Sequence, residues 1–173
     1  MILPLDDHLD LGGTTAGRAT ADRTPALAER LGVDVDWFLE LFGGPWYDAG
    51  SPALHDFDGD PSGGDGYPVT PWHVTGRPVQ LMVRVFTGHC FLARPEGRWA
   101  GGTHDLVWEE HDQVHLTYDD LRREEIVRPV VAGLVSSRRR RLRWCERCRE
   151  QQGPETMLGA LCHGCAQGTG VVF

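Results

Sequence analysis

The chain contains 173 residues, 40% of them hydrophobic, which suits one domain of ordinary size or one domain with a small appendage. No apolar run approaches the roughly 18 residues of a membrane-spanning helix, so we expect no membrane span. The amino-terminal residues carry acidic side chains where a secretory signal needs basic ones, and we therefore expect a cytoplasmic protein. In a reducing compartment, paired cysteines indicate a metal site and not disulfide bonds.

Charge and codon bias carry further information. All 17 basic residues are arginine, asparagine is absent, and isoleucine occurs only at Ile2 and Ile126. Lysine, asparagine and isoleucine have AT-rich codons, so this bias indicates a GC-rich genome, such as that of an actinobacterium or its phage.

The charge is divided unequally along the chain. Residues 1–120 hold 20 acidic residues and 7 arginines, whereas residues 121–173 hold 5 acidic residues and 10 arginines. This asymmetry suggests two surfaces with different partners.

Two short helices are predicted after the first twenty residues. Thr24 before Pro25 suits the start of a helix that ends at Gly32. Asp34 or Asp36 can cap a second helix that runs through Phe42. The pair resembles a helix-turn-helix motif, but its second helix carries carboxylates and no base where phosphate contacts need cations. We therefore expect a helical hairpin that packs into a core.

The region from residue 79 to residue 118 carries the strand signal. At its start, every second residue from 79 to 85 is valine or leucine, and this period of two is typical of a strand. We expect a small antiparallel sheet of about four strands with the helices packed on one face. The predicted strands are residues 79–86, 90–93, 106–109 and 114–118, with turns at 87–88, 95–97 and 110–113.

A long helix is predicted from Asp119 or Asp120, with an apolar stripe and with Pro129 kinking it or splitting it in two. It leads directly into the cysteine-containing segment. The predicted fold class is therefore α+β, with an N-terminal helical hairpin, a small antiparallel sheet and a long helix leading into a C-terminal zinc finger. The predicted divisions are a loosely ordered arm (1–23), an acidic α+β body (24–137), and an Arg-rich segment with a four-cysteine zinc module (138–173).

Four cysteines have metal-ligand spacing. Cys145 and Cys148 are separated by two residues, as are Cys162 and Cys165, with 13 residues between the pairs. Each pair can present two thiolates to one ion from a tight turn whose amides face the sulfurs. Four thiolates complete a tetrahedron without an open position, which predicts one structural Zn²⁺. The segment resembles a zinc ribbon or treble-clef finger over about residues 144–173, and such modules bind nucleic acid or protein, or brace a domain.

A run of arginines precedes the first cysteine. On a helix, successive arginines point in all directions, so some must face solvent or a partner. A basic stretch beside an aromatic residue and a zinc module suits phosphate contacts. The alternative is a helix terminus whose positive charge complements the helix dipole and pairs with the acidic body. The candidate nucleic-acid contacts are Arg138, Arg139, Arg140, Arg141 and Arg143.

The predicted function is non-enzymatic, because no phosphate loop, nucleophile elbow or helical zinc-protease motif is present. We expect a zinc-binding regulator, an accessory factor of transcription or recombination, whose Arg-rich part binds nucleic acid or nucleoprotein while its acidic body binds a protein. One alternative is a protein adaptor or DNA mimic that uses the acidic body. Another is a metal-dependent enzyme with a second site near His104, His111 and His115.

Overall fold

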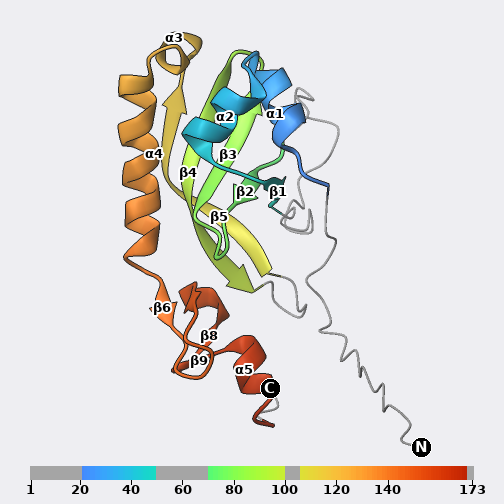
Figure 1. The fold of residues 1–173 in the computed structure, drawn as a ribbon, viewed down its shortest axis with the longest axis vertical. Helices are drawn as coiled ribbons and strands as arrows, with labels where there is room; N and C mark the ends of the chain where they lie inside the picture. The colour runs from blue at the N-terminus through green and yellow to red at the C-terminus, as the bar shows by residue number, and fades with distance from the viewer. Residues whose placement is uncertain (1–20, 50–69, 100–105, 171–173) are drawn as a thin grey trace, which may run out of the picture.

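The computed structural model describes residues 21–49, 70–99 and 106–170. A five-stranded antiparallel sheet and several helices form the body, and a small finger follows it (Figure 1), which confirms the predicted α+β class. The predicted arm lies almost entirely outside the described residues. The elements of the body are α1 (Thr24–Leu31), α2 (Val35–Phe42), β1 (Trp46–Asp48), β2 (His73–Thr75), β3 (Leu81–Phe86), β4 (His89–Trp99), β5 (Leu106–Leu116), α3 (Tyr118–Leu121) and α4 (Glu124–Arg139).

The sheet is a simple meander in which strands β1 to β5 follow one another in space as in sequence. Helices α1, α2 and α4 pack on one of its faces, as Figure 1 shows. Alternation along β3 places Leu81, Val83 and Val85 in the core beneath these helices. The opposite face carries a smaller buried cluster that includes Trp72 and Met82.

The helical hairpin forms as expected, with a small shift at its start. Helix α1 ends at Gly32, whose φ of 77° is the left-handed conformation that glycine adopts readily. The Asp34 side chain accepts the N–H groups of Asp36 and Trp37 and so caps α2. Thr24, expected as the cap of α1, is instead its first helical residue, and its N–H donates to Asp22.

Two predicted turns are wrong, because β4 and β5 are long continuous strands. The turn chemistry at 95–97 is overridden by pairing with β5, and Pro95 is tolerated because β3 pairs no further than Ala93 and leaves β4 at the sheet edge there. The hairpin expected at 110–113 is a β-bulge within β5. Asp112 adopts a left-handed φ of 54° at this bulge, a conformation that aspartate tolerates better than most residues.

The long helix divides earlier than expected. A capping box between Thr117 and Asp120 starts α3, and α4 begins anew at Glu124. Pro129 was expected to kink or split this helix, but it lies inside a continuous α4. Helix α4 buries three side chains with helical spacing, and the last of these is Arg138, at the end nearest the finger.

We predict that Asp34→Ala lowers the free energy of unfolding by about 1 kcal/mol, because two N–H groups at the start of α2 lose their acceptor. Asp34→Asn is the matched control and should change stability little, since asparagine caps equally well. Urea unfolding of the three proteins provides the measurement. Equal losses in both variants would show that the carboxylate charge, and not the cap, is what matters.

Candidate metal centre and its attachment to the sheet

The finger consists of two small hairpins and a short helix, and the four predicted metal ligands lie at their ends. Cys145 follows β6 directly, and Cys148 lies in the turn that leads to β7. Cys162 ends β9, and Cys165 lies in the first turn of α5. The structure therefore brings together residues from both ends of the finger. Its elements are β6 (Arg143–Trp144), β7 (Gln151–Gln152), η2 (Pro154–Thr156), β8 (Met157–Leu158), β9 (Leu161–Cys162) and α5 (His163–Gln167).

The spacing of the sulfurs is compatible with one metal ion. The four Sγ atoms all lie within 4.8 Å of one another, and those of Cys148 and Cys162 are 3.9 Å apart. Ligands about 2.3 Å from a tetrahedral ion are separated by about 3.8 Å, so the observed separation fits such a centre. All four cysteines are free thiols in this structure, so disulfide pairing is not the basis of the cluster.

Backbone amides point at the sulfurs, as the tight-turn prediction required. The N–H of Cys162 donates to Cys145 Sγ at 3.3 Å. This bond, together with the N–H groups of Cys148 and Arg147, lowers the pKa of Cys145 to about 6. The neighbouring Cys162 thiol and burial raise the pKa of Cys165 to about 12. When thiols at this distance lose their protons, the negative charges on the sulfurs repel one another. A bound metal cation takes the place of those protons and compensates for that repulsion.

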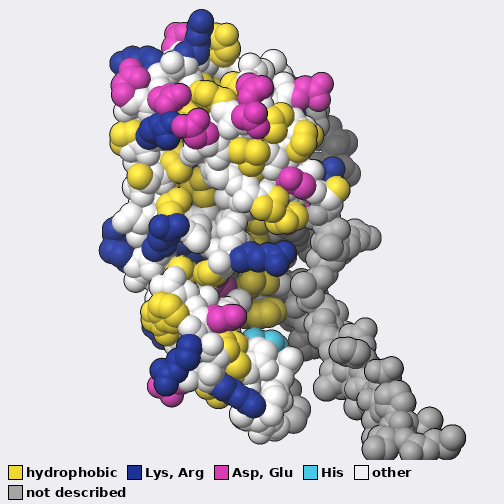
Figure 2. All heavy atoms as spheres, in the orientation of Figure 1, with side chains coloured by type: hydrophobic (Ala, Val, Ile, Leu, Met, Phe, Trp, Pro, Cys, Tyr) yellow, Lys and Arg dark blue, Asp and Glu magenta, His cyan; other side chains and the backbone are white. Residues whose placement is uncertain are grey.

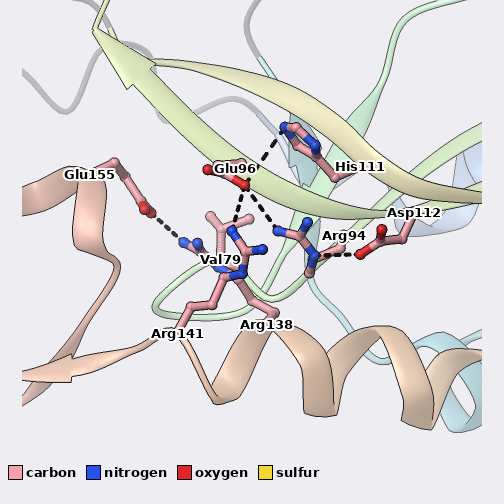
Figure 3. A network of polar contacts seen from close by, with 8 residues as sticks. All are labelled: Val79, Arg94, Glu96, His111, Asp112, Arg138, Arg141 and Glu155. Carbon is pink, nitrogen blue, oxygen red and sulfur yellow. Dashed lines mark hydrogen bonds and ion pairs between the residues drawn. The ribbon is translucent and has the colours of Figure 1, made fainter.

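The finger is attached to the body through Arg138, which is fully buried. Its guanidinium forms an ion pair with Glu155 of η2, whose side chain is only 3% exposed. Its Nε donates to the carbonyl of Val79 at 3.0 Å, and Figure 3 shows Arg138 between Val79 and Glu155. The Cζ atom of Arg138 also lies 5.8 Å from the ring centroid of Trp108. Arg138 therefore links α4, the sheet and the finger, and its side chain is not available to a nucleic acid.

Two further residues complete this attachment. The indole N–H of Trp99, at the end of β4, donates to the carbonyl of Glu155 at 2.7 Å. A side chain on Gly97 would lie 2.5 Å from Glu155 Cγ, so only glycine leaves room for that glutamate. Sequence reasoning did not single out Glu155, because an isolated glutamate in a finger has no characteristic spacing.

The other predicted arginines are exposed. Arg139 donates to Gln80 at 2.6 Å, and Arg140 donates to Ser136 in its own helix at 2.9 Å. Arg141 donates to Glu96 at 2.9 Å (Figure 3). The exposed side chains of Arg139 to Arg141 therefore keep donors free to reach a partner.

Arg143 lies on β6 with an exposed side chain. In the described part of the chain the guanidinium of Arg143 has no hydrogen-bonding or ionic partner. Glu96 accepts hydrogen bonds from both Arg141 and Arg94. These cations lower the pKa of Glu96, and the hydrogen bond from Arg94 has the largest effect.

The predicted second metal site gains no support from the residues that the structure describes. His104 lies outside them. His111 faces Glu96 at 3.7 Å, whereas the ring of His115 stacks on Phe91 with centroids 4.6 Å apart. Within the described ranges, the four cysteines form the single cluster of three or more possible metal ligands.

Comparison with known proteins found no similarity: no family model, no curated protein and no solved structure matches the chain. No helix among the described residues is both long enough and apolar enough to cross a membrane.

We predict that the purified protein carries a single metal ion per chain, and that Cys148→Ser reduces the occupancy severely because a closed thiolate site loses a ligand. Native mass spectrometry measures the occupancy. Cys90→Ala is the matched control, since this fifth cysteine is buried in the sheet, far from the finger in sequence, and should leave the metal in place. A fully folded, metal-free wild type would contradict the assignment.

We also predict that Glu155→Ala lowers the free energy of unfolding by about 3 kcal/mol, because the buried Arg138 charge loses its partner. The double variant Arg138→Met, Glu155→Leu should lose much less, since no buried charge remains. Chemical denaturation of Arg138→Met, of Glu155→Leu and of the double variant gives the coupling energy. Strictly additive losses would show that the two side chains do not act as a pair.

Proposed function

We propose that this chain is a non-enzymatic, zinc-stabilised regulatory protein that binds nucleic acid or nucleoprotein through exposed arginines at the end of α4 and on the finger. The observation that carries the proposal is the continuity of these arginines with a metal module that is fixed to the sheet. A transcription or recombination accessory factor of a GC-rich bacterium or its phage would have such a construction.

Zinc is the metal that the ligands favour. Four thiolates in a tetrahedral arrangement suit Zn²⁺, which requires no redox partner and no open position. A β-hairpin turn supplies Cys145 and Cys148, and the start of a helix supplies Cys162 and Cys165, an arrangement similar to a treble-clef finger. Such a site serves folding and not catalysis, because the finger is too small to bury an adequate core.

The distribution of charge supports a nucleic-acid surface at one end. Figure 2 shows acidic side chains gathered, among some arginines, at the end that carries α1, α2 and α3, while basic side chains prevail on the displayed face near the finger. Exposed arginines there include Arg139, Arg140, Arg141, Arg143 and Arg147. Arginine suits phosphate contacts because its charge is permanent and its donors can bind two oxygens at once.

The acidic end is the proposed surface for a protein partner. A shallow depression of 380 Å³ lies there between the turn joining α1 to α2 and helix α3, with Trp37 and Leu121 in its lining. Asp34 and Arg122 also line it, so the depression has both apolar and charged groups in its lining. Such a mixture is common where proteins associate. An adaptor that uses this end alone, or a DNA mimic, remains the competing hypothesis.

We predict that the protein binds a DNA or RNA probe with an affinity that falls steeply with salt. Replacing Arg139, Arg140, Arg141 and Arg143 with alanine should reduce the slope of log affinity against log salt by about 3, and should leave binding measurable at low salt but abolish it at physiological salt. Electrophoretic shift titrations over a range of salt concentrations measure both quantities.

A charge-matched control tests whether location matters. It replaces four exposed arginines at the opposite end with alanine and should retain the wild-type affinity: Arg30, Arg122, Arg123 and Arg128. Equal losses in both variants would indicate a response to net charge alone. No binding of wild type at any salt, together with capture of a stoichiometric basic protein, would favour the adaptor.

A further inference from the structure

Trp144 is the most exposed large hydrophobic residue that the structure describes, with 63% of its surface accessible. It lies on β6, immediately before the metal ligand Cys145. Within the described residues, its indole takes part in no ring stacking and has no guanidinium above it. An apolar ring of this size is therefore largely presented to solvent, which makes it available to a planar partner.

The backbone beneath this ring is firmly held. Trp144 pairs with Gln151 across the small β6–β7 hairpin, and the next residue donates its N–H to the carbonyl of Glu150 at 3.0 Å. Cys145 itself is buried and belongs to the metal cluster. Because the strand is ordered before any partner arrives, little backbone entropy is lost when a ligand stacks on the indole.

Arginines surround this ring in the sequence and in the finger. Arg140, Arg141 and Arg143 precede it, and Arg147 and Arg149 follow it in the turn that holds the first two cysteines. All five side chains are exposed, and within the described residues neither the Arg143 nor the Arg149 guanidinium has a hydrogen-bonding or ionic partner. An aromatic platform among unpaired cations matches the chemistry of a nucleotide chain, in which planar bases alternate with phosphates.

We propose, resting on the proposed function, that the partner is a single-stranded nucleic acid and that an unpaired base stacks on Trp144 while the neighbouring arginines bind phosphates. In a duplex the base faces are covered by neighbouring bases, so the indole can stack on a base only after it is unpaired. Stacking on an aromatic side chain tolerates any base, so this surface distinguishes single strands from duplexes and not one sequence from another.

The test compares fluorescence anisotropy titrations with labelled oligo(dT) and oligo(rU) of about 15 nucleotides and with a DNA duplex of the same length. Trp144→Ala should weaken single-strand binding roughly tenfold, since one stacked base is lost, and should change duplex binding less than about twofold. Trp144→Phe should restore most of the single-strand affinity. The affinities for oligo(dT) and oligo(rU) show whether the protein prefers single-stranded DNA or RNA.

Two controls keep the outcomes distinct. Tyr118→Ala removes another exposed aromatic ring, 52% accessible, at the opposite end and should leave every affinity unchanged. Metal content and unfolding midpoints check that the Trp144 variants are folded. Should Trp144→Ala lose its metal, Trp144→Leu carries the test, because leucine keeps an apolar side chain without the ring and should weaken single-strand binding as alanine does.

The inference and the function on which it rests fail in different ways. If Trp144→Ala weakens single-strand and duplex binding equally, or leaves single-strand binding intact while removal of the arginines abolishes it, the stacking inference is wrong and nucleic-acid binding stands. If wild type binds none of the probes, the proposed function itself is wrong.

Discussion

The buried guanidinium of Arg138 is the constraint on which the relation between finger and body depends. Removing such a cation from water costs several kcal/mol, and only matched partners compensate for that cost. Those partners are the Glu155 carboxylate from the finger and the Val79 carbonyl beside the sheet. Because Arg138 meets both partners at once, a finger in another orientation would leave this buried charge without its carboxylate, which favours the observed orientation. Apolar residues of equal volume would stabilise an interface as well, but they would fix its direction less strictly.

This orientation determines which cations reach solvent. Arg138 ends a buried stripe on α4, so the arginines that follow it leave the helix on the exposed side and continue onto β6. Arg141 is steadied by Glu96, whose charge is already shared with the buried Arg94. The Glu96 carboxylate therefore positions Arg141 and at the same time neutralises part of the basic surface. Arg143, beyond the helix, carries no such partner in the described structure.

The metal cluster was predictable from sequence, whereas much of its surroundings was not. A tetrahedral site demands ligands at fixed distances, and two cysteine pairs of the same spacing encode that demand locally. The turn expected at 95–97 failed because its residues pair with β5, a contact that local turn chemistry cannot reveal. Arg138 follows Val127 and Leu134 at helical spacing. Its position in that period is compatible with burial, whereas its charge led us to predict a surface contact with nucleic acid, which is wrong for this residue.

Function is harder to predict than the metal site for a related physical reason. A phosphate contact needs a flexible cation near an extended anion and imposes no fixed spacing on the sequence. Neighbouring arginines can consequently take opposite roles, as Arg138 in the interior and Arg139 at the surface do. The number of arginines in such a run overstates the charge offered to a partner. What matters is how many guanidinium groups retain unsatisfied donors once the finger is in place, and that number depends on the tertiary structure alone.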